Sequence, residues 1–148
     1  NIEKIVDLGF VGVPEKINTG IIEILTSNDF IPVIAPLGIN EEGKTFNINA
    51  DTVAGAIAHS LNAKRLLVLT DVEGVIDDQK NVIAELSKSE AKNLINNDII
   101  SGGMIPKINT CIDALENGVS AAVIVDGRVK HAVLLELFTE HGAGTLIR

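Results

Sequence analysis

A lysine that closely follows two adjacent glycines is the first feature of this sequence that could do chemistry. Residues 101–107 read SGGMIPK, and the apolar residues after Gly103 recur at helical spacing. The glycines therefore lie near a helix start, where free backbone N–H groups and the positive end of the helix dipole favour an anion. Lys107 lies within about one turn of that start, so a bound phosphate would offset its charge. A Gly-rich turn followed by a solvated lysine explains the same spacing.

A carboxylate, Asp51, stands at the start of another expected helix. The apolar residues that follow it share one helical face, and they are Ala54, Ile57, Ala58 and Leu61. A negative charge in the first turn suits the helix dipole.

Residues 38–45, GINEEGKT, match the phosphate-loop pattern G-x-x-x-x-G-K-[ST] letter for letter. The mechanism of that loop requires a helix opening at the Lys-Thr pair. Residues 46–49 instead alternate between apolar and polar side chains, as a strand does. Glu41 and Glu42 would also place two anions where phosphates should bind. We therefore interpret this segment as a polar hairpin turn.

Buried strands and amphipathic helices alternate along the chain. Strands are expected at 30–36, 65–70, 121–125 and 145–147, with short strand pieces within 5–13. Helices are expected at 17–25, after Asp51, at 86–95 with Ser87 or Ser89 as its cap, at 102–116 and at 132–138. This order predicts an α/β fold, a mostly parallel open sheet with helices on both faces in three layers. Ligands of such sheets bind beyond the carboxyl ends of the strands, here at Thr70-Asp71 and Asp126-Gly127.

The composition excludes several classes of protein. The chain has 148 residues, 46% apolar and 22% charged, which is ordinary for a globular domain and unlike disordered or fibrous chains. A net charge of −8, with no Trp or Tyr for base stacking, argues against a nucleic-acid surface. No apolar run approaches the ~20 residues of a membrane span. Asn1 in place of Met indicates a processed chain or a piece of a longer one.

The few metal-binding and redox-active residues are scattered. The lone cysteine, Cys111, lies in a helical apolar stripe, which predicts a buried thiol in a reducing compartment. One cysteine and three separated histidines cannot supply a zinc site of the usual ligand spacing. We therefore expect no metal bound directly by the chain.

Four short blocks occur in one order: NINAD at 47–51, LTDVEGV at 69–75, SGGMIPK at 101–107 and DGR at 126–128. Together they closely resemble the N-acetylglutamate kinases of the amino-acid kinase family, and the resemblance runs from about Asp7 to Arg148. It covers only the carboxy-terminal part of such an enzyme. The family's amino-terminal Gly-rich phosphate loop, first catalytic lysine and substrate-clamping arginine have no counterpart here.

The resemblance implies a role for individual residues. Lys107 would contact the nucleotide phosphates, Asp51 would organise the catalytic lysines, and Asn47 would bind the amino-acid substrate. We therefore expect the Asp51 carboxylate and the Lys107 ammonium group to meet at one pocket mouth, beside the turn at Thr70 and Asp71. Residues 1–62, with a hairpin near 38–49, would be the remainder of the substrate lobe, and 63–148 the nucleotide-binding lobe. The nucleotide would contact two segments, which comprise Asp71, Val72, Glu73, Gly74, Val75, Ile76, Ile99, Ile100 and Ser101.

The implied activity is transfer of a phosphoryl group from ATP to the side-chain carboxylate of N-acetyl-L-glutamate, which forms an acyl phosphate in arginine biosynthesis. Mg²⁺ would arrive with the nucleotide, and the parent enzyme would be a homo-oligomer in the cytoplasm or in a plastid. We expect the chain alone to be inactive. Two alternatives stay open: a non-catalytic nucleotide- or amino-acid-sensing module, and another amino-acid kinase acting on carbamate, aspartate or glutamate.

The tail of the chain resembles that of the arginine-inhibited members of the family. Glu136 would bind the guanidinium of the effector bidentately, with His131 and the backbone near Gly144 holding the rest. An ordinary helix surface explains His131 and Glu136 equally well.

Overall fold

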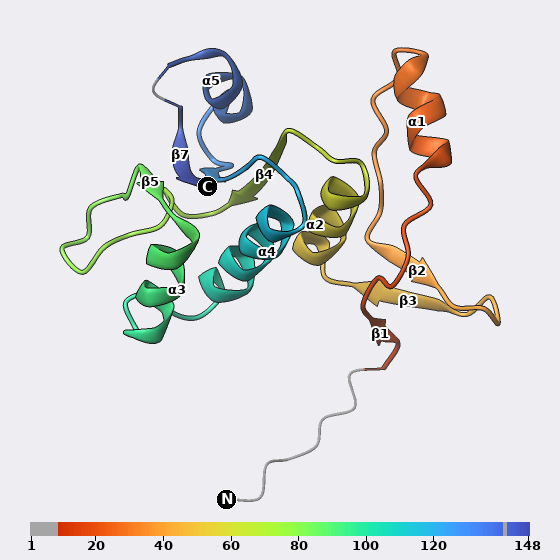
Figure 1. Ribbon diagram of the computed structural model, residues 1–148, viewed down its shortest axis with the longest axis horizontal. Helices are drawn as coiled ribbons and strands as arrows, with labels where there is room; N and C mark the ends of the chain where they lie inside the picture. The colour runs from red at the N-terminus through yellow and green to blue at the C-terminus, as the bar shows by residue number, and fades with distance from the viewer. Residues whose placement is uncertain (1–8, 141) are drawn as a thin grey trace, which may run out of the picture.

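The computed structural model describes residues 9–140 and 142–148, which form helices and two small sheets (Figure 1). The helices are α1 (Gly20–Ser27), α2 (Ala50–Ser60), α3 (Lys88–Asn96), α4 (Met104–Glu116) and α5 (Ala132–Phe138). The strands are β1 (Val11–Gly12), β2 (Leu37–Ile39), β3 (Thr45–Ile48), β4 (Arg65–Thr70), β5 (Glu85–Leu86), β6 (Ala121–Asp126) and β7 (Gly144–Ile147).

The larger sheet has the strand order β4-β6-β7-β5. β4 runs parallel to β6 and β5 runs parallel to β7, whereas β6 and β7 are antiparallel. Val68 and Ile124 face the core beneath α2 and α4, and Val123 and Val125 pack with Ala132 of α5 on the opposite face. Burial on both faces explains why β6 is almost continuously apolar. β4 is buried on the face toward α2 and α4 and only partly covered on the other, where Leu69 is 48% exposed. The predicted three-layer α/β architecture, with helices on both faces, is confirmed.

The smaller sheet contains the hairpin that the sequence predicted. β2 and β3 are antiparallel, and β1 lies parallel to β3. The side chain of Asn40 closes the turn by accepting hydrogen bonds from the backbone N–H groups of Glu42 and Lys44, at 3.1 and 2.9 Å. The ammonium group of Lys44 lies 3.9 Å from the centre of the Phe10 ring. Because residues 45–48 continue as a strand and no helix opens there, the match to a phosphate loop is coincidental.

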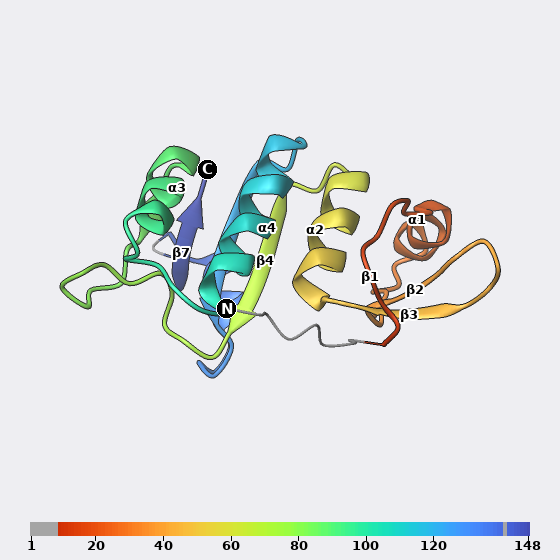
Figure 2. The ribbon, with the colours of Figure 1, turned by 90° about the horizontal axis from the view of Figure 1, so that it is seen from below.

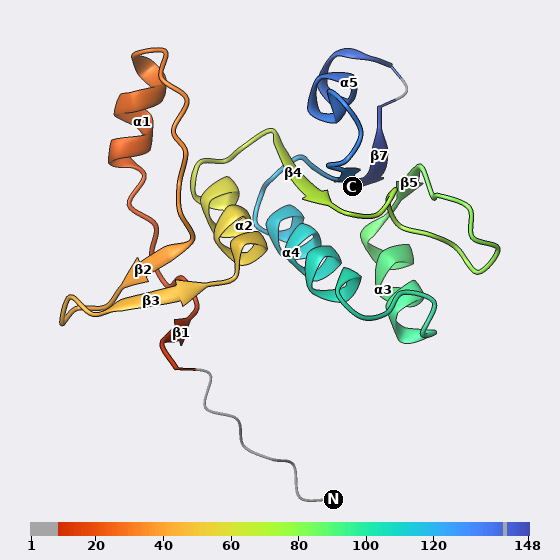
Figure 3. The same cartoon turned by 180° about the vertical axis from the view of Figure 1, so that it is seen from behind.

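The predicted buried strand at 30–36 is wrong. Residues 30–35 form no strand, and Ile31 and Val33 are 90% and 96% exposed. Two prolines deprive the segment of N–H donors, and its backbone has no neighbouring strand to pair with among the described residues. The segment runs beside α1 at one end of the molecule, away from the larger sheet (Figures 2 and 3). Its side chains and those of α1 and α2 leave an apolar groove of about 310 Å³.

Other boundaries differ by a few residues. α1 begins at Gly20 instead of residue 17, and α4 begins two residues after Gly102. Ser87 caps α3 in a reciprocal capping box with Glu90, so one of the two predicted caps is confirmed. Of the strand pieces expected within 5–13, β1 is present, and residues 5–8 lie outside the described part of the chain. No helix in that described part is long and apolar enough to cross a membrane.

Candidate active site

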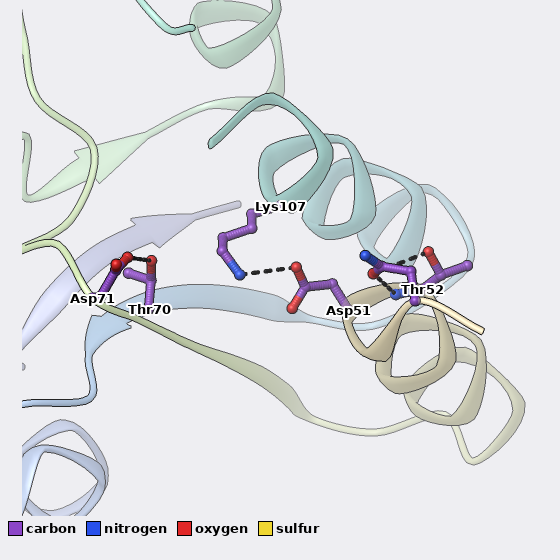
Figure 4. Close-up of polar contacts among 6 residues, drawn as sticks. Asp51, Thr52, Thr70, Asp71 and Lys107 are labelled. Carbon is purple, nitrogen blue, oxygen red and sulfur yellow. Dashed lines mark hydrogen bonds and ion pairs between the residues drawn. The ribbon is translucent and has the colours of Figure 1, made fainter. Parts of the chain in front are cut away.

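Asp51 and Lys107 meet, as the sequence analysis expected. The Lys107 ammonium nitrogen lies 2.9 Å from one Asp51 carboxylate oxygen, and both side chains are about one-fifth exposed, at 21% each. Figure 4 shows Lys107 between Asp51 on one side and the Thr70–Asp71 turn on the other. A charged pair that water still reaches can exchange its partner for a bound ligand, which a fully buried pair cannot do cheaply.

Two features of α2 bring Asp51 to this position. The side chain of Asn49 caps the helix by accepting a hydrogen bond from the backbone N–H of Thr52 at 3.2 Å, which fixes the first turn where Asp51 lies. Gly55 faces α4, and a methyl group there would come within 2.8 Å of the Thr110 side chain. The missing side chain therefore allows α2 and α4 to pack closely enough for the ion pair to form. Nothing in the apolar pattern revealed this contact, although Asn49 just before a helix was a recognisable cap signal.

Lys107 projects from the beginning of α4. Gly103 is the N-cap residue and provides no side-chain hydrogen bond, and Gly102 has a left-handed φ of 59°. A methyl group on either glycine would have no heavy atom within 4 Å among the described residues. Pro106 lies in the first turn, where its missing N–H costs no intrahelical bond. The N–H groups of Met104 and Ile105 make long hydrogen bonds to the Ser101 and Gly102 carbonyl oxygens, at 3.4 and 3.3 Å. The start of α4 therefore combines an uncrowded glycine pair, the positive end of the helix dipole and one lysine.

The predicted nucleotide loop begins at the carboxyl end of β4. The Thr70 hydroxyl donates to the Asp71 carboxylate at 3.4 Å, and the Val75 N–H donates to the Thr145 hydroxyl at 2.9 Å. Gly74 has a φ of 151°, and a methyl group there would lie 2.8 Å from that hydroxyl oxygen. These contacts tie the loop to β7. The second predicted segment, 99–101, directly precedes the turn into α4, and its Ile100 shares a hydrophobic core with Val75. The structure thus places both predicted segments around the same core as α4.

Asn47, the predicted substrate ligand, is an exposed residue of β3. It lies opposite Leu37 in the hairpin and Val11 in β1. One residue separates it along the chain from Asn49, the cap of α2, so it approaches the same end of that helix as Asp51.

The predicted effector residues are only partly brought together. The Glu136 side chain is 9% exposed, which rules out an ordinary surface position for it. One of its oxygens accepts a hydrogen bond from the Ala143 N–H at 2.8 Å, and the other lies 3.7 Å from the Arg65 guanidinium. Gly144 follows Ala143, so it lies close to Glu136. His131 is exposed at the start of α5, with a left-handed φ of 63°.

Cys111 lies one turn after Lys107 and is completely buried. Burial, and secondarily the nearby Asp51 carboxylate, raises the pKa of the Cys111 thiol to about 12, against a smaller opposing effect of Lys107. The thiol therefore stays protonated at neutral pH, and a nucleophilic role for it is excluded. Its burial matches the sequence prediction.

An ion pair that sequence reasoning missed lies at the end of β6. The Asp126 carboxylate accepts hydrogen bonds from Arg128, and the guanidinium and backbone N–H of Arg128 hold the pKa of Asp126 below its usual range. Both residues belong to the DGR block, and Asp126 was expected at the ligand-binding edge of the sheet, but the ion pair between them was not predicted. Within the described residues, no group of three or more His, Cys, Asp or Glu side chains is placed to hold a metal ion.

Known proteins resemble this chain over nearly its whole length. An acetylglutamate kinase of Parvibaculum lavamentivorans is 62% identical over 148 residues, which are 100% of this chain and 49% of that protein. An acetylglutamate kinase of Rhodospirillum centenum is 61% identical, over 99% of this chain and 48% of that protein. The chain therefore spans about half the length of the curated relatives that it matches.

A solved structure shares the fold. The N-acetylglutamate synthase of Neisseria gonorrhoeae, complexed with coenzyme A and L-arginine, superposes with a TM-score of 0.89 and 32% identity, over 96% of this chain and 33% of that one. The sequence profile described as "Amino acid kinase family" matches residues 2–126, which include Asp51, Lys107 and the loop after β4. With its α/β layers and this match over most of its length, the chain belongs to the amino acid kinase family.

Proposed function

We propose that this chain is part of an ATP-dependent kinase that phosphorylates the side-chain carboxylate of N-acetyl-L-glutamate to an acyl phosphate, a step of arginine biosynthesis. The observation that carries the proposal is the ion pair of Asp51 and Lys107, whose charged atoms are 2.9 Å apart and whose side chains are each about one-fifth exposed, beside the turn at the end of β4. Relatives about 60% identical to the chain bear the name of that activity.

The residues suit the chemistry. The acceptor carboxylate is already ionised at neutral pH, so no general base is needed. The obstacle is the approach of one anion to another, and catalysis of that step is mostly alignment and cationic stabilisation of the transferring oxygens. Lys107 would supply the positive charge, together with the backbone N–H groups at the start of α4. Asp51 would hold the Lys107 side chain in position until the phosphates bind.

The two ligands would approach from opposite sides of this pair. The nucleotide would lie against residues 71–76 and 99–101, which share a core with α4. The amino acid would lie toward Asn47 at the amino end of α2. In this proposal, 1–62 would be the remainder of a substrate lobe and 63–148 would be a nucleotide lobe. Mg²⁺ would come with ATP, held by phosphates and water.

The exposed apolar end of the chain supports a larger parent protein. Side chains of α1, of 30–35 and of the hairpin are exposed, and β4 is an open edge of its sheet among the described residues. Exposed apolar surface of this extent usually marks an interface. We infer that further polypeptide, about as long as this chain in the relatives, covers it and completes the active site. A Lys-x-Gly-Gly-like segment upstream would favour the kinase, and an unrelated domain would favour a sensor.

The decisive assay is ATP-dependent hydroxamate formation by the complete protein. We expect the acyl phosphate to be trapped with N-acetyl-L-glutamate, and much less product with glutamate, aspartate or carbamate at equal concentration. Product from one of the other acceptors would reassign the substrate. Nucleotide binding without product from any acceptor would favour the sensing module.

Arginine is the proposed inhibitor of the same protein. Glu136 supports this, because its carboxylate already lies beside one guanidinium, that of Arg65, and because it also accepts a hydrogen bond from the Ala143 N–H, next to Gly144. We expect millimolar L-arginine to lower the hydroxamate rate severalfold, and D-arginine to have much less effect. If titration with arginine neither changed the rate of hydroxamate formation nor produced a heat of binding, the effector site would be removed from the proposal.

A further inference from the structure

Two loops leave the larger sheet side by side at its carboxyl edge. β4 and β6 are parallel, and Thr70 pairs in register with Asp126. One residue further on, the Gly127 N–H donates a hydrogen bond to the Thr70 carbonyl oxygen at 2.8 Å. A methyl group on Gly127 would approach that oxygen and the Leu69 side chain to 3.4 Å. The turn that carries Arg128 is therefore packed directly against the start of the loop proposed to bind the nucleotide.

The Arg128 side chain is fixed although it lies at the surface. Its side chain is 61% exposed, whereas that of Asp126 is only 7% exposed. The Asp126 carboxylate accepts the backbone N–H and the Nε–H of Arg128 at 2.9 Å each, and an Nη2–H at 2.8 Å. A forked pair of this kind holds a guanidinium in one orientation. Folding has therefore already restricted a side chain that would otherwise lose rotamer freedom on binding.

The fixed guanidinium belongs to an acidic surrounding. Asp126 is the main cause of the raised pKa of the Arg128 guanidinium, and the more distant Asp71 and Glu73 carboxylates add smaller contributions in the same direction. Asp71 directly follows Thr70, whose carbonyl oxygen accepts the Gly127 N–H, so the loop that carries both carboxylates begins beside the Arg128 turn. Both carboxylates lie in the proposed nucleotide loop, where they would repel the phosphates of ATP. Arginine has five N–H donors, and two of them bind Asp126, so the outer edge of the guanidinium stays available to the loop.

We propose that Arg128, held by Asp126, is a positioning residue for the nucleotide loop: it offsets the charges of Asp71 and Glu73 and orders the loop for an incoming nucleotide. This inference rests on the proposed function only in taking residues 71–76 as the nucleotide loop. It requires no contact between Arg128 and the transferring phosphoryl group. Replacing Arg128 should therefore weaken nucleotide binding and leave the chemical step nearly unchanged.

The test is a titration of the complete protein with a fluorescent ADP analogue and Mg²⁺. We expect Arg128→Gln to raise the dissociation constant about tenfold at low salt, and less at high salt, because exposed charges are screened. Asp126→Asn keeps the positive charge of Arg128 but weakens the hydrogen bonds that hold its guanidinium, so we expect the dissociation constant to rise about threefold. The matched control is Arg148→Gln, which removes another exposed arginine. Arg148 pairs with Glu85 of β5, at the edge of the sheet opposite β4. This variant should bind the analogue as the unchanged protein does.

A second variant separates charge compensation from a general structural role. In Arg128→Gln protein, the additional change Glu73→Gln removes one of the carboxylates that Arg128 offsets, and we expect most of the lost affinity to return. In the hydroxamate assay, Arg128→Gln should raise KM for ATP and change kcat less than threefold. Unchanged binding by Arg128→Gln, or no recovery in the double variant, would overturn the inference. A protein that binds the analogue but forms no hydroxamate would refute the kinase proposal and leave this inference standing.

Discussion

Replacing Lys107 by alanine in the complete protein is expected to lower kcat about a hundred- to a thousandfold while changing KM for ATP less than about threefold. A preorganised cation acts mainly on charge that develops as the phosphoryl group transfers, so its loss is felt in the transition state more than in the bound state. The start of α4 and the loop after β4 would still hold the nucleotide. Initial rates of hydroxamate formation at varied ATP separate the two parameters.

A lysine whose ion pair also involves α4 provides the matched control. Lys92 of α3 forms an ion pair with Glu116 of α4 at 2.7 Å, and both side chains are about half exposed. Lys92→Ala should leave kcat and KM unchanged, because exposed pairs contribute little. Thermal unfolding must accompany both variants, since Lys107→Ala leaves the Asp51 carboxylate without its partner, at a cost of about 1–3 kcal/mol. A folded Lys107→Ala protein with normal turnover would show that Lys107 takes no part in the chemistry.

The two long strands of the larger sheet could be predicted because their sequences are continuously apolar. β6 is buried on both faces, and in β4 the side chains of Leu66 and Val68 are buried on one face while Leu67 packs partly buried on the other, so apolar side chains run through both strands without alternation. The strand expected at 65–70 has those bounds in the structure, and the one at 121–125 is longer by Asp126 alone. β5, by contrast, is two residues long and has no pattern of its own; its pairing with β7 comes from tertiary structure.

The failure at 30–36 has a physical explanation. An apolar run indicates that a segment is shielded from water, but it does not indicate which part of the protein packs against it. Val33 is 96% exposed in this chain, so none of the described residues shields this apolar side chain from water. Local patterns cannot separate a strand of the chain's own sheet from a segment that packs against other polypeptide.

The candidate site was predictable in its parts and not in its assembly. Helical periodicity placed Asp51 and Lys107 in the first turns of two helices, as observed. Their contact depends on the close packing of α2 and α4 at Gly55, which residue spacing alone cannot predict. The expectation that the two side chains meet came from the resemblance to a family. Arg128 was missed because an Asp-Gly-Arg turn is common, and its significance arises only from the neighbouring loop.

Replacing Gly144 by alanine is expected to destabilise the fold by about 3 kcal/mol or more, in the absence of any ligand. Gly144 pairs with Val125 at the start of β7, and a methyl group there would overlap the carbonyl oxygen of Ile124. Because that oxygen belongs to the backbone of a central strand, a rotamer change cannot relieve the clash. β7 would have to move, and with it Thr145, which holds the nucleotide loop through the Val75 N–H. Chemical denaturation of the 148-residue chain measures the loss.

The control is the same substitution at Gly20, the first residue of α1. There the only heavy atom within 4 Å of a new methyl group, among the described residues, is the end of the Asn18 side chain at 3.3 Å. Alanine favours helix more than glycine does, so Gly20→Ala should leave the free energy of unfolding unchanged or raise it by up to about 1 kcal/mol. If the Gly144→Ala protein were as stable as the Gly20→Ala protein, the result would contradict the close approach of Gly144 in β7 to the Ile124 carbonyl oxygen in β6. If it were unstable, weakened arginine inhibition in that variant could not be assigned to lost effector contacts, and only Glu136 would remain to test the effector site.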